Sequence, residues 1–335
     1  MTPQNHHKFN LETISNYRTI LRFVLTWAAT IAILWIVFSR TNPAQVLVLL
    51  KQTNIGYLGL GILFSLLAHV FFSLARYQNI IKLVGCRLSF GEAVMLRMGC
   101  NAVKGVLPFK TGELAIVAYM KKMHNLSYAG GLFSILFGNV FSLIVLLLFF
   151  SAGGIFYFFD RPQSIIFAVA LLLIMLLLIL LSSWRIGPSV SGYVQKYFRL
   201  SEASMSMMEN YDPGTIKYII IHSLGIEGSK LLIIFILLKS FHVEISAAVL
   251  LLWGSATILA AYLPLTYWGL GVREATVLFL FAGYATPDKL LAGGLLITFV
   301  DSILPVLLGL FFIKPFLDNL LGRKKVETGI LSGDG

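Results

Sequence analysis

Apolar residues occupy the chain in long runs that are separated by short polar segments. Such runs are typical of helices that cross a lipid bilayer, where one crossing needs about 20 mostly apolar residues. The pattern predicts six transmembrane helices, over residues 23–38, 57–74, 128–150, 164–184, 214–239 and 290–312.

Two further apolar segments, residues 90–120 and 246–284, are interrupted by glycine, proline and charged residues. The first is broken at Leu107–Glu113 and the second at Leu263–Ala275. At membrane depth, broken backbone is tolerated only where protein or a water-filled cavity surrounds it. The helix after the first break has about ten residues, so it reaches only about half of a roughly 30 Å hydrocarbon core. We therefore interpret both segments as re-entrant helical hairpins.

The composition supports a membrane protein, because 58% of the residues are hydrophobic and only 12% are charged. A soluble domain carries about twice that charged fraction. The formal charge of +11 is spread over the ends of the apolar runs, which is the positive-inside pattern and not a nucleic-acid-binding surface. We expect one membrane domain over 1–335 in the cell (cytoplasmic or inner) membrane, with cytoplasmic segments at 1–22 and 313–335.

The two halves of the chain are predicted to form an inverted repeat, over residues 23–151 and 164–312, because the charge pattern places the hairpins on opposite membrane faces. Opposed broken helices that meet at the midplane are a recurring plan of transporters. The expected fold class is therefore an all-α polytopic membrane protein with about six transmembrane helices and two re-entrant hairpins. Two short sequence matches link the halves, Leu107–Pro108 with Leu263–Pro264 and Ala129–Leu132 with Ala292–Leu295.

The two breaks also hold the candidate binding residues. The second helix of a hairpin presents free backbone N–H groups and partial positive charge at its start, which suits a phosphate group. The candidates for binding a headgroup flank the breaks: Lys104, Lys110, Gly112 and Glu113 at the first, and Gly269, Gly271, Arg273 and Glu274 at the second. Polar residues inside apolar helices are expected to support them: Arg97, Asn139, Glu227, Lys230 and Asp301.

Purely structural roles are also consistent with several of these residues. Arg273 and Glu274 are adjacent and are candidates for an ion pair that closes the second hairpin, and Glu113 is a candidate for capping its own helix. Glu227 and Lys230 are three residues apart, so they share a helix face and are expected to pair. His69 is expected to bond to a neighbouring helix.

Enzyme signatures are absent from the sequence. It contains no HExxH, no GxSxG, no P-loop and no DxD-type metal pair, and Cys86 and Cys100 lack a metal-binding spacing. We predict no enzymatic activity, no cofactor and no metal. An intramembrane enzyme would have to depend on Glu227, Asp301 or His222.

The second break resembles the signature of the lysylphosphatidylglycerol synthase transmembrane region family. The resemblance lies in Leu263–Pro264 followed by Gly-Leu-Gly-Val-Arg-Glu-Ala at Gly269–Ala275. Leu107–Pro108 and Gly112–Leu114 resemble the first-half motif of that family. The resemblance implies a flippase-like membrane domain, as in multiple peptide resistance factors and stand-alone relatives.

Two departures from the family pattern bear on the site. Ile116 stands where relatives commonly carry an Arg. If the first motif binds a headgroup in this chain, the positive charge would have to come from Lys110, Lys104 or Arg97 instead. Tyr267–Trp268 stand where small or polar residues are usual, which would narrow the cavity. The soluble aminoacyl-transferase domain of the family's fusions is absent, so the resemblance implies translocation without lipid aminoacylation.

Together these observations predict a lipid translocase that moves a phospholipid or lipid-linked headgroup between leaflets. The expected partners are membrane lipids with an anionic or phosphate-bearing headgroup, and a homo-oligomer or a lipid-modifying enzyme partner is left open. The alternative is a non-transporting scaffold or accessory subunit for a glycosyltransferase or a lipid-synthesis enzyme.

Overall fold

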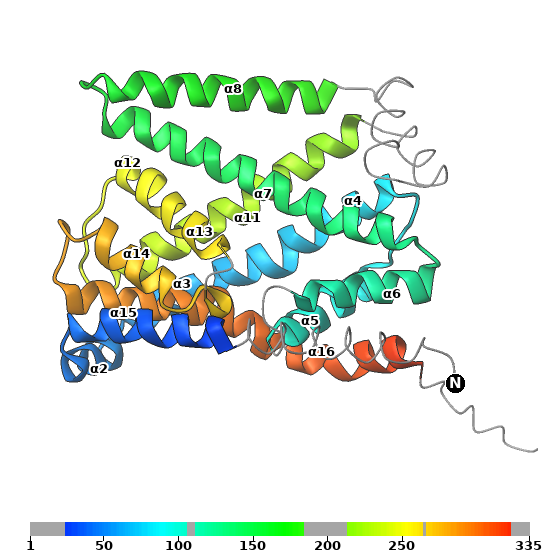
Figure 1. The fold of residues 1–335 in the computed structure, drawn as a ribbon, viewed down its shortest axis with the longest axis horizontal. Helices are drawn as coiled ribbons and strands as arrows, with labels where there is room; N and C mark the ends of the chain where they lie inside the picture. Colours follow the sequence, from blue (N-terminus) through cyan, green and yellow to red (C-terminus); the bar gives the residue numbers. More distant parts are fainter. Residues whose placement is uncertain (1–23, 106–110, 184–212, 264–265, 323–335) are drawn as a thin grey trace, which may run out of the picture.

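The computed structural model describes residues 24–105, 111–183, 213–263 and 266–322. Every regular element in these ranges is helical, which confirms the all-α class (Figure 1). Four helices are long and apolar enough to cross a membrane: Ile55–Leu83, Tyr128–Tyr157, Gly214–Lys239 and Pro287–Leu321. A fifth crossing is formed if Val24–Ser39 and α2 (Pro43–Lys51), which are bent by 88°, count together. The expected number of six crossings stays a prediction.

The first long helix consists of α3 (Ile55–Leu66), the π-helical turn η1 (Leu67–Phe72) and α4 (Ser73–Leu83). We expected this helix to end at residue 74, which left Arg76 outside it. This was wrong, because the helix continues to Leu83 and Arg76 is buried inside the bundle.

The helices α7 (Tyr128–Tyr157), α8 (Gln163–Ser183) and α11 (Pro213–Lys239) follow the third, fourth and fifth predicted runs. Ser127 caps α7 by accepting a hydrogen bond from the backbone N–H of Gly130 at 3.0 Å. The central helix is α11, which contacts α3, α4, α7 and α15 (Pro287–Thr298). Its residues Ile233, Leu237 and Leu238 are fully buried in the largest apolar cluster.

Both predicted hairpins contain two helical limbs. The first consists of α5 (Phe90–Lys104), the 3-10 turn η2 (Thr111–Glu113) and α6 (Leu114–His124). The second consists of α12 (Ala247–Val249), the π turn η3 (Leu250–Gly254), α13 (Ser255–Tyr262), the 3-10 turn η4 (Tyr267–Gly269) and α14 (Val272–Leu280). The centres of the two breaks, residues 106–110 and 264–265, lie outside the described residues.

The two breaks face each other. The Tyr267 hydroxyl donates a hydrogen bond of 2.9 Å to the carbonyl oxygen of Gly105, at the end of α5. Figure 1 shows α13 and α14 in the left half of the molecule and α5 and α6 in the right half. The hairpins therefore extend from the contact between their breaks into different halves of the bundle. The inverted symmetry between the two repeats stays a prediction.

The last long helix packs closely against the first hairpin. It consists of α15, the π turn η5 (Phe299–Ile303) and α16 (Leu304–Leu321), and α16 lies along α5. A Cβ atom on Gly309 would collide with the carbonyl oxygen of Met98 and would lie 2.8 Å from the amide nitrogen of Ala102. Small residues allow this close backbone approach, which stabilises helix pairs inside membranes.

The contact between α5 and α16 gives the first prediction. Gly309→Ala is expected to lower the thermal unfolding midpoint in detergent, because overpacking costs about 1–3 kcal/mol and outweighs the better helix propensity of alanine. Gly59→Ala is the matched control, since Gly59 is an exposed helical glycine whose added Cβ meets no atom within 4 Å. An equal midpoint for the two variants would contradict the described packing.

Candidate functional site

Each of the four long helices carries a polar or ionisable residue near its middle. A residue halfway along a membrane-crossing helix lies at the centre of the hydrocarbon core, where polar groups are costly and commonly functional. These four residues face the interior of the bundle, and they are His69, Ser142, Glu227 and Asp301.

Two of these residues lie on π-helical turns. His69 is in η1 and Asp301 is in η5, and π turns inside α-helices are common at functional sites. The sequence explains η5, because Pro305 has no N–H and cannot donate the α-helical hydrogen bond to the carbonyl of Asp301. The hydroxyl of Ser65 donates to the carbonyl of Val300 at 2.7 Å and supports this turn.

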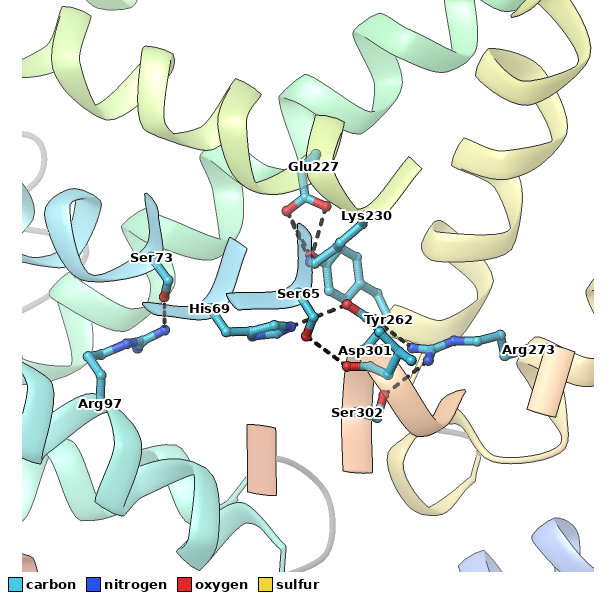
Figure 2. Close-up of polar contacts among 11 residues, drawn as sticks. Ser65, His69, Ser73, Arg97, Glu227, Lys230, Tyr262, Arg273, Asp301 and Ser302 are labelled. Carbon is cyan, nitrogen blue, oxygen red and sulfur yellow. Dashed lines mark hydrogen bonds and ion pairs between the residues drawn. The ribbon is translucent and has the colours of Figure 1, made fainter. Parts of the chain in front are cut away.

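Asp301 joins three elements at the centre of the site (Figure 2). Its Oδ1 lies 3.2 Å from Nε2 of His69, as we expected for a contact between His69 and a neighbouring helix. Its Oδ2 lies 3.2 Å from a guanidinium nitrogen of Arg273 on α14. Arg273 also donates to the Ser302 hydroxyl at 3.1 Å. The carboxylate thus links η1, η5 and the second hairpin.

Glu274 has a different role from its neighbour Arg273, so the alternative of an ion pair between these two residues was wrong. Adjacent helical residues point about 100° apart, and Glu274 turns away from the partners of Arg273. Its carboxylate accepts from the backbone N–H of Gly271 and from the Thr298 hydroxyl, both at 2.6 Å, and it is fully buried. Glu274 therefore closes the start of α14 and fixes it to α15.

A second group of charges lies beside Asp301. The Lys230 ammonium is 3.1 Å from the Glu227 carboxylate, which confirms their expected pairing. Tyr262, the last residue of α13, donates to Glu227 at 3.0 Å and accepts from Lys230 at 2.9 Å. Because Glu227 is 0% exposed, its charge is compensated inside the protein.

The first hairpin supplies a third pair across its break. The Lys104 ammonium lies 2.8 Å from the Glu113 carboxylate, and Asn139 of α7 donates to the same carboxylate at 3.5 Å. The expected alternative that Glu113 caps α6 was wrong, because it makes no side-chain cap hydrogen bond there. Gly112 is required for the turn, since a Cβ atom would lie 2.6 Å from the Cα of Lys104.

Two arginines complete the site. Arg76 on α4 donates to the hydroxyls of Ser142 at 2.7 Å and Ser223 at 3.2 Å. Arg97 on α5 donates to the Ser73 hydroxyl at 2.7 Å. Both guanidinium groups are therefore held by neutral hydroxyls.

Most of these groups line one cavity of about 260 Å³ between the two hairpins and the long helices. The wall combines charged groups with apolar ones such as Ile226, Ile258 and Val306. Eight of the predicted binding and supporting residues belong to this wall: Arg97, Lys104, Glu113, Asn139, Lys230, Gly269, Arg273 and Asp301.

The remaining predicted residues lie elsewhere. Gly112, Gly271 and Glu274 support the backbone of the breaks, and Glu227 lies behind Lys230; none of the four belongs to the cavity wall. Lys110 lies outside the described residues.

Of the pair Tyr267–Trp268 that we expected to narrow the cavity, Tyr267 does not do so, because it is not part of the cavity wall, and the side chain of Trp268 lies outside the described residues. The Tyr267 ring stacks on Trp27 with 4.7 Å between the ring centres. Its backbone N–H donates to the Thr30 hydroxyl at 3.0 Å. Tyr267 therefore joins the first described helix to both breaks.

The sequence reasoning missed Arg76 and Tyr262 as cavity residues. A signal for Arg76 was present, since Ser65, His69, Ser73 and Arg76 recur every three or four residues and thus lie along one helix face. This polar stripe indicates a helix that continues past residue 74. Tyr262 carries no comparable signal, because its role depends on the distant pair on α11.

The groups expected for an enzyme or a metal centre are not assembled in the described part of the chain. His222 on α11 is half-buried and bonds to the Tyr218 carbonyl of its own helix, and it is not in the cavity wall with Asp301. In the described ranges, no three His, Cys, Asp or Glu side chains are grouped so that they could hold a metal ion.

Comparison with known families gives one match. The family model of the lysylphosphatidylglycerol synthase TM region matches residues 19–309, which include both hairpins and every cavity residue. This confirms the resemblance of the motifs at the two breaks. No curated protein matches the chain.

The ion pair between Arg273 and Asp301 gives the second prediction. Arg273→Gln and Asp301→Asn are each expected to lower the thermal unfolding midpoint, because each leaves a buried charge without its partner. The double variant is expected to lose less than the sum of the single losses, with a coupling of about 1–3 kcal/mol.

Exposed neighbours between α7 and α8 provide the matched control pair for this cycle. Asp160→Asn and Arg161→Gln make the same chemical changes at the surface and are expected to be additive. Additive losses at Arg273 and Asp301 would show that the pair does not stabilise the site.

Proposed function

The chain belongs to the lysylphosphatidylglycerol synthase TM region family, and we propose that it is an integral membrane lipid translocase. In this proposal it moves a phospholipid or a lipid-linked headgroup between the two leaflets. The family match supports a membrane role that is related to lipids, and the cavity supports translocation in particular.

The observation that carries the proposal is a charged cavity at the middle of apolar helices. An ion transferred from water into hydrocarbon loses of order 20 kcal/mol of solvation in the ideal case. Fixed charges and hydroxyls in the cavity wall would replace the water that a polar headgroup leaves behind. The acyl chains would stay outside, beside exposed apolar residues of the helices that line the cavity, such as Leu143 of α7 and Leu307 of α16.

The cavity also lies where two opposed gates would be needed. Gly269 and Arg273 reach it from the second hairpin, and Lys104 and Glu113 reach it from the first. Short helical limbs that are joined by breaks can move with little disruption of the long helices. A movement of one hairpin at a time would open the cavity toward one leaflet at a time.

The alternative of a scaffold for a glycosyltransferase or lipid-synthesis enzyme has less support. A docking protein has no need for charged side chains inside its own helices, where they are costly. Catalysis is not part of the proposal, since the chain shows no catalytic motif. We further propose, from the positive-inside pattern, that both termini lie in the cytoplasm and that the membrane is the cell (cytoplasmic or inner) membrane.

The third prediction tests transport directly. The purified chain is reconstituted into vesicles with a fluorescently labelled phospholipid, and translocation is measured by quenching the label in the outer leaflet. Arg273→Gln is expected to slow translocation at least about tenfold, because one charge-assisted contact of about 1.5–3 kcal/mol is lost.

Arg161→Gln is the control and is expected to match the unmodified chain, because Arg161 is exposed outside the helices. Size-exclusion profiles show that each variant is folded. Absence of translocation by the unmodified chain, together with stable capture of a membrane enzyme, would replace the translocase with the scaffold.

A further inference from the structure

We propose that Arg76 and Arg97 form a phosphate-binding subsite within the cavity. The ligand is the phosphodiester of an anionic lipid headgroup. This inference rests on the proposed function and adds the residues and the chemical group that they recognise.

The charges in the cavity wall divide into compensated and uncompensated ones. Lys104 is paired with Glu113, and Arg273 is paired with Asp301. Lys230 is paired with Glu227 directly behind the wall. These three cations therefore attract an added anion less than their number suggests.

Arg76 and Arg97 differ from these cations, because no carboxylate of the described ranges lies within ion-pairing distance of either one. Their partners are the hydroxyls of Ser142, Ser223 and Ser73. Two guanidinium charges in the same cavity wall are thus left without a carboxylate in direct contact, and the charges of Glu227 and Glu113 act on Arg76 only from beyond ion-pairing distance.

The burial of Arg76 makes this arrangement costly. Only 9% of the residue is exposed, and both described hydrogen bonds use the same terminal nitrogen, NH1. A buried charge that lacks a counter-charge costs several kcal/mol. A bound anion would remove that cost, since a guanidinium group matches the spacing of two phosphate oxygens.

The surrounding helices hold the two guanidinium groups in place. Ser73, Arg76 and Tyr77 lie on one face of α4, and the Arg97 guanidinium lies 5.4 Å from the centre of the Tyr77 ring. On α7, Gly138 lies beside Arg76, whose NH2 would be in ordinary contact with an added Cβ atom at 3.8 Å. The position of each guanidinium is therefore set before any ligand binds.

A second, smaller cavity of about 30 Å³ adjoins the same two arginines. Ser73, Glu113 and Asn139 belong to the walls of both cavities. The smaller cavity extends between α4 and α7 to Ser134. The arginines therefore line both cavities. A phosphate in the main cavity would leave the smaller space for water that completes its hydration.

The two guanidinium groups without a paired carboxylate favour an anionic substrate over a neutral one. A neutral glycolipid would leave both positive charges uncompensated. The single negative charge of a phosphodiester would compensate one of them, and its oxygens would accept hydrogen bonds from both guanidinium groups. Free phosphate has the same recognition chemistry as a headgroup phosphate, so the experiment must separate these two sources.

The fourth prediction measures binding to the purified full chain in detergent. The probes are dihexanoyl phosphatidylglycerol below its micellar concentration, inorganic phosphate, and a short-chain glucosyl diacylglycerol without phosphate. Arg76→Gln and Arg97→Gln are each expected to weaken binding of the phospholipid at least about tenfold. Arg161→Gln is the matched control and is expected to bind normally.

The lysine variants and the unliganded stability separate recognition from a structural role. Arg76→Lys and Arg97→Lys keep the charge and are expected to recover part of the affinity. The thermal midpoint of Arg76→Gln without lipid is expected to equal or exceed that of the unmodified chain, because an uncompensated charge is removed. Arg97 is only partly buried, so its glutamine variant keeps the test decisive if Arg76→Gln does not fold.

Three results would overturn the inference or its ligand. Unchanged phospholipid affinity in the folded glutamine variants would overturn the subsite, and so would equal affinity for the phosphate-free glycolipid. Inorganic phosphate that binds as tightly as the phospholipid would support the subsite and overturn a lipid headgroup as its ligand.

The proposed function can fail separately from this subsite. Phospholipid binding that depends on Arg76, without translocation in vesicles, would reject the translocase and keep the subsite. Translocation that is unchanged in Arg76→Gln and Arg97→Gln would reject the subsite and keep the translocase.

Discussion

The structure depends on the compensation of charge in an environment without water. Lipid cannot solvate the ionisable groups that this chain carries in the middle of its helices, so their partners must come from other helices. Asp301 provides the central case, since its two oxygens engage His69 and Arg273 from elements that are far apart in the sequence. The carboxylate therefore fixes the relative position of a long helix and a hairpin.

Irregular backbone brings these groups to the same depth. The π turns carry His69 and Asp301, and Tyr262 at the end of α13 contacts the pair on α11. A regular α-helix would form more of its backbone hydrogen bonds, but it would distribute its side chains evenly around the axis. The hydroxyl of Ser65 on the Val300 carbonyl shows how the neighbouring helix offsets the cost of one such irregularity.

The sequence predicted what depends on local pattern, and it missed what depends on distant contacts. Long apolar runs gave the helices, and the three-residue spacing of Glu227 and Lys230 gave their ion pair. The partner of Arg273 was missed, because Asp301 approaches it only after the chain has folded. Arg76 was left outside the predicted helix over residues 57–74, because a charge at the end of an apolar run normally marks a membrane edge. Here the charge belongs to a polar helix face that begins at Ser65.

The family motif at the second break combines two roles through the geometry of one helix start. Gly271 has a φ of 84°, a conformation that favours glycine, and its N–H is bound by Glu274. This closes the first turn of α14 without water, which a helix end inside the membrane requires. Because neighbouring residues point about 100° apart, the same turn that buries Glu274 directs Arg273 into the cavity. The adjacent Arg and Glu therefore act together without touching, since one holds the helix start and the other presents a charge to the cavity.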